Sequence, residues 1–214
     1  MASILITSGP TRQYLDPVRY LTNASSGRMG AALAAAALGR GHRAVVVAGP
    51  SEVDYPSDCD LHRVETTEEM LETCLRLFRS CDGLIAAAAP CDYRPVTVAP
   101  RKIRKSNRPL ALELVETPDV VAALATARGA QWIVAFALET EDRHMLAMQK
   151  LERKSCDLIV VNGPAAMRSA QTSVEVLDRA GRIVLAAAGE KTRVAENLLE
   201  LIEQRFIARP AAEP

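Results

Sequence analysis

The stretch RYLTNASSGRMGAALAAAALGRGHRAVVVA, residues 19–48, joins a polar loop to an alanine-rich segment and then to a β-branched run. The alanine-rich part, 28–40, predicts a buried helix, because alanine has the highest helix propensity. Residues 44–48, AVVVA, are apolar at consecutive positions, which is typical of a strand buried on both faces. A loop, a buried helix and a doubly buried strand in this order indicate an α/β fold.

The same alternation continues along the chain. Four more apolar runs predict buried strands: SILIT (3–7), GLIAAA (83–88), WIVAF (132–136) and DLIVV (157–161). Further helical patterns lie over 67–80, 118–128, 140–155 and 191–206. Thr66 and Glu69 predict a capping box, and Thr117 predicts an N-cap followed by Pro118 in the first turn. The sequence therefore predicts a doubly wound, mostly parallel, Rossmann-like sheet.

Two segments interrupt this alternation. Residues 89–116 hold four prolines and six basic residues directly after a strand, which predicts a basic lid loop. Residues 172–186 predict an extra β-hairpin that turns at 179–181. We expect a single domain over 1–207 and a flexible tail over 208–214.

The charge and the cysteine content indicate a small-molecule partner. Lys plus Arg and Asp plus Glu both number 26, so the overall charge favours neither a nucleic-acid nor a membrane surface. The five cysteines form no C-x-x-C pair, which argues against a disulfide framework or a structural zinc site. Without a signal-peptide pattern or a long uncharged apolar run, we expect a cytoplasmic protein.

The loop that follows the first strand is a candidate anion site, because ligands of open parallel sheets bind beyond the carboxyl ends of the strands. Gly9 and Gly27 permit close backbone approach, and the N–H groups at the start of the next helix attract anions. Capping of that helix by Ser25, Ser26 and Gly27 explains the same residues equally well. The glycine spacing is not G-x-G-x-x-G, so the usual dinucleotide fingerprint is missing.

Two basic clusters add to this pattern. RKIRKSNR, residues 101–108, follows a strand end, where an anion such as a triphosphate would relieve the repulsion between its charges. Lys150 and Lys154 are four residues apart on one predicted helix face and could clamp phosphates. A solvated basic loop and simple surface solubility are the alternative interpretations of these clusters.

No pattern indicates nucleophilic or metal catalysis by the protein itself. His42, His62 and His144 have no ligand spacing, G-x-S-x-G is absent, and Cys91 is interpreted as a packing residue. We therefore expect no metal site built by protein side chains. The chemistry predicted is electrostatic stabilisation, by cations and N–H groups, of a substrate that brings its own leaving group.

Taken together, the motifs resemble those of phosphopantothenate–cysteine ligases (phosphopantothenoylcysteine synthetases), which act in coenzyme A biosynthesis. They are ILITSGPTR, DPVRYLTNASSGRMG, AAAAPCDYRP, KIRK, TPDVVAAL, FALETE, KLERKSCDLIVVN and GEKTRVAENLLELI. The resemblance covers nearly the whole chain. In many bacteria this domain follows a flavin-dependent decarboxylase in one polypeptide. No such domain precedes the motifs in this sequence, so a stand-alone synthetase is expected.

The resemblance implies a reaction in two steps. The carboxylate of 4'-phosphopantothenate attacks the α-phosphate of CTP, or of ATP in the eukaryotic branch, and pyrophosphate leaves. The amine of cysteine then attacks the acyl-nucleotidylate and releases the nucleoside monophosphate. It also implies Mg²⁺ held mainly by triphosphate oxygens, a homodimer, and a separate phosphopantothenoylcysteine decarboxylase as a partner.

The resemblance also implies roles for individual residues. Asn23 would handle the carboxylate and the acyl intermediate, and Lys102 would stabilise the departing pyrophosphate. Arg19 would reach the substrate phosphate of the neighbouring subunit. The remaining substrate-binding residues would be Ser25, Ser26, Gly27, Ala88 and Asp92. The nucleotide would contact Gly9, Asp92, Lys102, Pro118, Asp119, Val120, Val121, Phe136, Lys150 and Lys154.

Some positions depart from the family pattern and bear on nucleotide preference. Arg104 replaces the middle lysine of K-x-K-K, Pro90 and Cys91 replace small aliphatic residues, and Leu138 replaces the second alanine of FAAET.

Two other functions are alternatives to the ligase. A short-chain-type nicotinamide-dependent reductase needs Tyr-x-x-x-Lys, which none of the four tyrosines provides. A non-catalytic nucleotide-binding protein would keep Lys150 and Lys154 but would have little need for Asn23 and Lys102 together. The ligase is therefore the favoured prediction.

Overall fold

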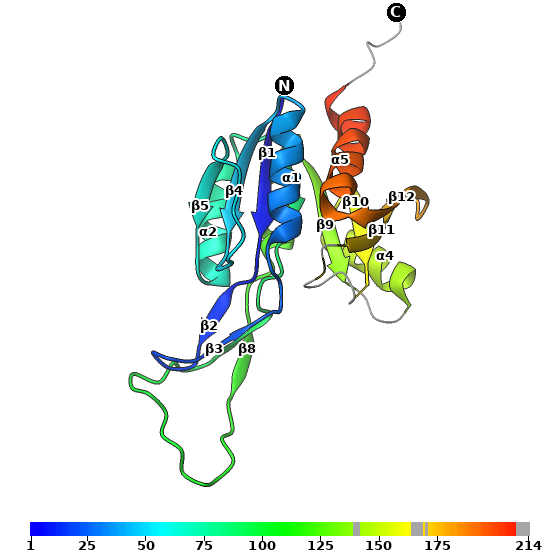
Figure 1. Cartoon of the computed structure of the whole chain (residues 1–214). Helices are drawn as coiled ribbons and strands as arrows, with labels where there is room; N and C mark the ends of the chain where they lie inside the picture. Colours follow the sequence, from blue (N-terminus) through cyan, green and yellow to red (C-terminus); the bar gives the residue numbers. More distant parts are fainter. Residues whose placement is uncertain (139–141, 164–168, 170, 209–214) are drawn as a thin grey trace, which may run out of the picture.

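A parallel sheet with helices on both faces forms the body of the protein (Figure 1). The computed structural model describes residues 1–138, 142–163, 169 and 171–208. In the described part, the sheet has eight strands in the order β12-β11-β10-β9-β6-β1-β4-β5. The parallel strands are β1 (Ser3–Ser8), β4 (Arg43–Ala48), β5 (Asp60–Arg63), β6 (Gly83–Ala86), β9 (Trp132–Leu138) and β10 (Leu158–Asn162). The predicted doubly wound sheet is confirmed.

The strand order reverses beside β1, because the chain passes from β1 to β4 on one side and later to β6 on the other. Such a switch point leaves a crevice between the loops that follow the two central strands. A bridge between Pro10 and Ala89 continues the pairing of β1 and β6 into these loops. The ligand site is therefore expected where the chain leaves β1 and β6.

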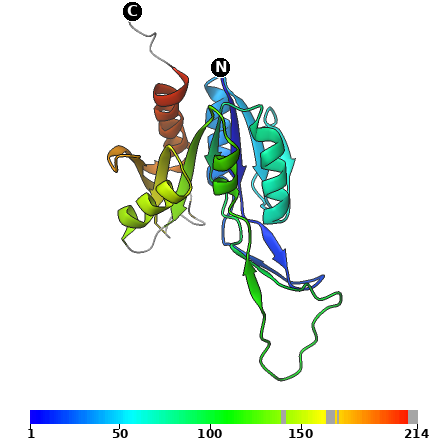
Figure 2. The ribbon, with the colours of Figure 1, turned by 180° about the vertical axis from the view of Figure 1, so that it is seen from behind.

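Helices cover the sheet in two layers (Figures 1 and 2). α1 (Arg28–Gly39) and α5 (Lys191–Ile202) pack on one face, and α2 (Thr67–Phe78), α3 (Val120–Ala127) and α4 (Arg143–Arg153) on the other. Alternate residues of β1 serve the two cores: Ile4 and Ile6 face α1, and Leu5 faces α2. This two-sided burial is the reason that the strands are apolar at consecutive positions.

The start of a helix differs from the prediction where the predicted capping side chain forms a hydrogen bond with another segment. Thr117 is not the N-cap of α3, because its hydroxyl donates to the Cys91 carbonyl at 2.7 Å. Asp119 caps the helix instead, its Oδ1 accepting from the Ala122 N–H at 3.1 Å, so Pro118 lies before the helix. The Thr66 cap of α2 is confirmed, but Glu69 accepts from the Glu65 N–H and not from that of Thr66.

The ends of α4 and α5 also differ from the prediction. α4 begins at Arg143, and the predicted start at 140 lies outside the described residues. α5 ends at Ile202, where a π-helical turn, η2 (Glu203–Ile207), takes over the last part of the predicted helix. Of the predicted tail, residues 209–214 lie outside the described part.

The predicted hairpin extends the sheet by two antiparallel strands. It consists of β11 (Gln171–Asp178) and β12 (Ile183–Glu190) and is longer than the predicted 172–186. Asp178 Oδ1 accepts from the N–H groups of Ala180 and Arg182 at 3.0 Å each, and Gly181 has φ +73°. These contacts form the turn at the predicted position.

A slender arm leaves the carboxyl edge of the sheet (Figures 1 and 2). We define the arm as residues 12–22 and 93–116. It contains two antiparallel pairs: β2 (Arg12–Tyr14) with β3 (Tyr20–Thr22), and β7 (Tyr93–Pro95) with β8 (Leu114–Glu116). Residues 96–113, the basic loop, form its far end and extend away from the body, and the role of this loop as a lid stays a prediction.

Candidate functional site

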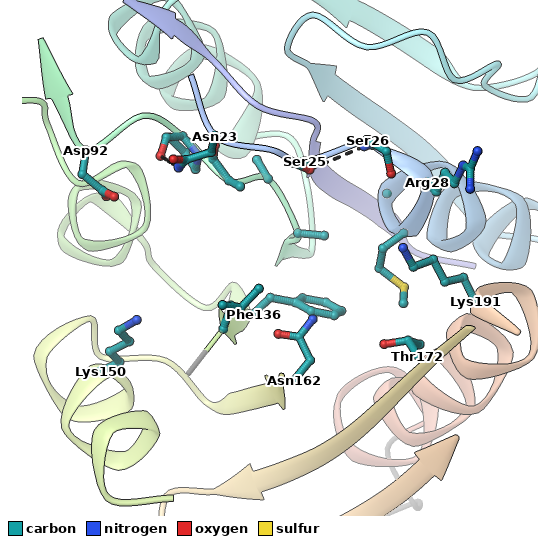
Figure 3. A pocket seen from close by; sticks show the side chains of 18 of the residues that line it. Asn23, Ser25, Ser26, Arg28, Asp92, Phe136, Lys150, Asn162, Thr172 and Lys191 are labelled. Atoms are coloured by element: carbon teal, nitrogen blue, oxygen red, sulfur yellow. Dashed lines mark hydrogen bonds between the residues drawn. The ribbon is translucent and has the colours of Figure 1, made fainter. Parts of the chain in front are cut away.

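A cavity of about 390 Å³ opens at the carboxyl edge of the sheet, at the switch point (Figure 3). Its walls come from the loop before α1, the loop after β6, strands β9 to β11, and helices α4 and α5. The predicted site residues among its lining are Asn23, Ser25, Ser26, Gly27, Ala88, Asp92, Phe136, Lys150 and Lys154. Segments that are far apart in the sequence thus meet at one place.

A second cavity of about 340 Å³ adjoins the first. The two share Ala88, Pro90, Asp92, Phe136, Lys150 and Lys154, and the second adds the predicted residues Pro118, Asp119, Val120 and Val121. Because the two share a wall, we treat them as one elongated cleft. The space suits an extended ligand better than a compact one.

The loop before α1 is held close to the sheet. Ser8 Oγ donates to the Gly27 carbonyl at 3.1 Å and accepts from the Tyr55 hydroxyl at 2.8 Å. Gly27 has φ +76°, and a Cβ at Gly30 would lie 2.0 Å from Ser8 Oγ. Glycine is therefore required at both positions, by backbone conformation at Gly27 and by close packing at Gly30.

The structure shows no side-chain cap at this loop, so of the two interpretations only anion binding stays a prediction. The N-cap residue of α1 is Gly27, which has no side chain to cap the helix. Ser25 Oγ accepts only from the Gly27 N–H, at 3.5 Å. Ser26, Gly27 and Arg28 line the cavity, so the start of α1, where the first N–H groups of a helix have no partner within the helix, borders this space. The geometry favours an anion site.

The loop after β6 is fixed by hydroxyl groups. Thr7 Oγ1 accepts from the Ala88 N–H at 3.3 Å, and Thr11 Oγ1 accepts from the Cys91 N–H at 2.7 Å. Thr67 Oγ1 donates to the Cys91 carbonyl at 3.1 Å, beside the bond from Thr117. Sequence reasoning missed this frame, since the threonines come from three separate segments, 7–11, 67 and 117.

Asn23 connects the two loops. Its side-chain Nδ2 donates to the carbonyl groups of Pro90 at 2.8 Å and Ala89 at 3.3 Å. The amide group is therefore oriented by the neighbouring loop, at the mouth of the cleft where Asp92 also lies (Figure 3). A side chain held in this way can present its oxygen in a fixed direction.

Basic side chains dominate the charge of the first cavity. Among the described residues, it is lined by Arg28, Lys150, Lys154 and Lys191 against the single carboxylate of Asp92. Lys154 Nζ lies 3.1 Å from Asp119 Oδ2, which ties α4 to the start of α3. Burial, together with the nearby Arg28, lowers the pKa of Lys191. The excess of positive charge fits a polyanionic ligand.

Sequence reasoning missed four of the polar residues that line this cavity: Arg28, Asn162, Thr172 and Lys191 (Figure 3). Within the described part of the chain, Asn162 Oδ1 and Thr172 Oγ1 are buried without a hydrogen-bond partner. A ligand with donor groups could satisfy them. Asn162 ends β10 at the carboxyl edge, and this position was the available signal for it.

Three predicted residues lie outside the lining of the cleft: Gly9, Arg19 and Lys102. Gly9, with φ +77°, packs against Gly49 and its carbonyl accepts from the Ala89 N–H at 2.9 Å, so it shapes the crevice from behind. Arg19 and Lys102 belong to the arm, where Lys102 is exposed. The structure therefore divides the predicted site between the cleft and the arm.

The remaining chemistry of the described residues is limited. They contain no group of three or more His, Cys, Asp or Glu side chains that could hold a metal ion. Cys91 is buried, and its Sγ donates to the Tyr93 carbonyl at 3.2 Å, as expected of a packing residue. None of the described helices is long and apolar enough to cross a membrane. The cleft can bind and polarise an anion.

The chain was compared with known protein families. Residues 1–206 match the model of the DNA/pantothenate metabolism flavoprotein C-terminal domain. The chain belongs to this family. A relative from Vibrio vulnificus (strain YJ016), the coenzyme A biosynthesis bifunctional protein CoaBC, is 40% identical over 163 residues, which is 75% of this chain and 41% of the relative. The chain thus spans about two fifths of that protein's length.

Solved structures of the family agree with the fold. The C-terminal domain of a CoaBC protein is 32% identical, with a TM-score of 0.82 over 95% of this chain and 94% of that chain. Cab2 mutant H337A in complex with phosphopantothenate-cysteine is 16% identical, with a TM-score of 0.74 over 95% of this chain and 87% of that chain, and shows the fold alone. The resemblance drawn from the sequence motifs is confirmed at the level of the family.

Proposed function

We propose that this family member is a phosphopantothenate–cysteine ligase of coenzyme A biosynthesis. The observation that carries the proposal is a single cleft that combines the N-terminal end of α1, four basic side chains and the oriented amide of Asn23. The names of the CoaBC relatives and the phosphopantothenate-cysteine complex of Cab2 support the substrate class.

In the proposed first step, the carboxylate of 4'-phosphopantothenate attacks the α-phosphate of a nucleoside triphosphate. The N–H groups of α1 and the basic side chains would stabilise the triphosphate and the charge that develops as pyrophosphate leaves. Asn23 would hold the substrate carboxylate and then the acyl group. In the second step, the cysteine amine attacks that acyl group, and the nucleoside monophosphate leaves.

We propose CTP as the nucleotide, because the relatives that match are bacterial proteins and the motif resemblance assigns ATP to the eukaryotic branch. Phe136 and the segment Pro118–Val121 would contact the base and the ribose. Mg²⁺ would enter with the triphosphate and be held mainly by its oxygens. Asp92 is the carboxylate of the first cavity that could add a protein oxygen to such an ion.

The arm supports a proposal about assembly. Arg19 and Lys102 do not line the cleft of their own chain, and the arm carries exposed apolar residues such as Val98, Leu110 and Leu112. We propose a homodimer in which the arm of one copy serves the cleft of the other. A separate decarboxylase in the same cytoplasmic compartment would consume the product.

The test is pyrophosphate release by the purified protein with 4'-phosphopantothenate and Mg²⁺, with CTP or ATP, and with or without cysteine. We expect release that requires phosphopantothenate, is faster with CTP, and becomes catalytic with cysteine. The variant Lys150→Gln should raise the nucleotide KM about tenfold by removing one charge from the cleft. Arg79→Gln, which removes an exposed charge at the end of α2, is the matched control. No release with either nucleotide would contradict the proposal.

A further inference from the structure

Ile103 is the main anchor of the basic loop at the far end of the arm. The Ile103 N–H donates to Asp16 Oδ2 at 3.1 Å, and the Ile103 carbonyl accepts from Arg19 Nη2 at 2.9 Å. Arg19 Nη1 also lies 3.1 Å from Asp16 Oδ2. Within the described part of the chain, the other hydrogen bond from residues 97–112 to the β2–β3 segment joins the Ala99 N–H to the Leu15 carbonyl at 2.9 Å.

Asp16 is the centre of this anchor. Its side chain has no exposed surface, although it lies in a thin arm. Its second oxygen, Oδ1, accepts from the N–H groups of Val18 at 2.8 Å and Arg19 at 2.9 Å. Burial by itself would raise the pKa of Asp16, but these N–H groups, that of Ile103 and the Arg19 guanidinium outweigh it, so the pKa lies below its usual value.

The anchored peptide lies between two exposed cations of the KIRK sequence, Lys102 and Arg104. A loop with five basic residues over 101–108 repels itself and would sample many conformations without a fixed point. Because Lys102 is bonded directly to Ile103, the Asp16 anchor sets where its chain begins. This is the arrangement that a positioning residue requires.

We propose that Asp16 is a positioning residue of the ligase: through Ile103 and Arg19 it holds the basic loop so that Lys102 is presented in a fixed place to the cleft it serves. The inference rests on the proposed function only for the role of Lys102. The anchoring itself can be measured without any activity, so the two can fail separately.

The first test is the rate of trypsin cleavage at Arg101–Lys105 in the intact protein. In Asp16→Asn, one of the two carboxylate oxygens becomes an NH₂ group, which cannot accept a hydrogen bond. Either the N–H groups of Val18 and Arg19 or the N–H group of Ile103 then lose their acceptor. The negative charge beside the Arg19 guanidinium is also lost. We expect cleavage about tenfold faster than in the wild type, because cleavage follows the open population of the loop. Arg19→Met, which removes the donor to the Ile103 carbonyl, should act in the same direction.

Asp178→Asn is the matched control. Asp178 is also a buried carboxylate in a turn, and it is held by backbone N–H groups and by Arg182 Nη2 at 2.8 Å, far along the chain from the arm. This variant should show a similar change in Tm but an unchanged rate of loop cleavage. If Asp16→Asn and Arg19→Met also leave cleavage at the wild-type rate, the proposed positioning role is wrong.

The second test uses pyrophosphate release. Asp16→Asn should lower kcat about tenfold while leaving the nucleotide KM nearly unchanged, since Lys102 would still be present but misplaced. The double variant Asp16→Asn, Lys102→Gln should be no slower than Lys102→Gln alone. Fully additive losses would overturn the positioning role. If the wild type releases no pyrophosphate, the proposed function fails, and the cleavage rates still decide whether Asp16 anchors the loop.

Discussion

The body and the arm of this protein are held together by different forces. In the body, the strands have residues such as Ile4, Leu5 and Ile6 buried completely on both faces, and apolar contacts fix them. In the arm, exposed residues such as Val98 and Leu110 outnumber buried ones, and the anchor is the hydrogen-bonded Asp16. The cleft is thus built on a rigid frame, while the basic loop depends on a few polar contacts that can break.

The largest effect is expected in the body, at Asn23. Asn23→Asp replaces the donor to the Ala89 and Pro90 carbonyls with a carboxylate, which would repel both these oxygens and the substrate carboxylate. Turnover should fall about 10³-fold, while nucleotide binding changes little. Pyrophosphate release and nucleotide titration measure the two separately. Unchanged turnover would contradict the proposed role of Asn23 in the reaction.

The next effect tests the arm. Lys102→Gln removes an exposed charge, so Tm should not change, but kcat should fall about 10²-fold if the charge acts on the departing pyrophosphate. Arg63→Gln, at an exposed position on β5, is a matched charge control. A rise in KM at constant kcat would assign Lys102 to substrate binding alone.

A glycine of the body should affect stability and not chemistry. A Cβ at Gly49 would lie 1.7 Å from the Pro10 carbonyl oxygen, so Gly49→Ala should lower the free energy of unfolding by about 2 kcal/mol. Gly39→Ala meets nothing within 4 Å and should be neutral or slightly stabilising. Denaturant unfolding of both variants tests this, and equal stabilities would show that the crevice behind the site is not tightly packed.

Mixing the two inactive variants would show whether body and arm cooperate between chains. If a cleft receives the arm of a second copy, dimers that combine Asn23→Asp and Lys102→Gln subunits regain one intact site. An equal mixture should then recover roughly one quarter of wild-type activity. Activity that stays at the level of the single variants would favour a site completed within one chain.

The smallest effect concerns a polar contact of the body. The hydrogen bond from Arg40, helped by His42, lowers the pKa of Glu203 despite its partial burial. Because the folded pKa lies below the unfolded value of 4.5, this stabilisation is complete above that pH and is lost as the pH falls through the folded pKa. Its size should be below about 1 kcal/mol. Glu203→Gln should remove this part of the pH dependence in thermal unfolding.

The body could be predicted from the sequence more completely than the arm. Strand 44–48 and helix 28–40 follow from local apolar patterns, and the helix is in place to within one residue. β2 and β7 have three residues each, which is too short for a period to be visible. The anchor at Asp16 joins residues 87 apart and leaves no local signal.

The cleft itself was predicted in part. The spacing of Lys150 and Lys154 did not separate a phosphate clamp from surface solubility, and these lysines, like Asn23, were assigned to the site by their motifs, which are local signals; all three line the cavity. Lys191 and Thr172 line the same cavity because β11 and α5 return to it from the far end of the chain. The error at Thr117 has the same origin, since its hydroxyl bonds to Cys91 and not to its own helix.

The threonine hydroxyls around Cys91 also have a defined direction. Thr67 Oγ1 uses its proton on the Cys91 carbonyl, so in its 2.8 Å contact with Thr11 Oγ1 the proton must come from Thr11. Thr11 in turn accepts from the Cys91 N–H. The three bonds form a closed ring through the N–H and the carbonyl of one residue, Cys91, with a single arrangement of protons in which each bond polarises the next. The loop after β6 is therefore held by a cooperative set of hydrogen bonds, and removing either hydroxyl would break the whole ring.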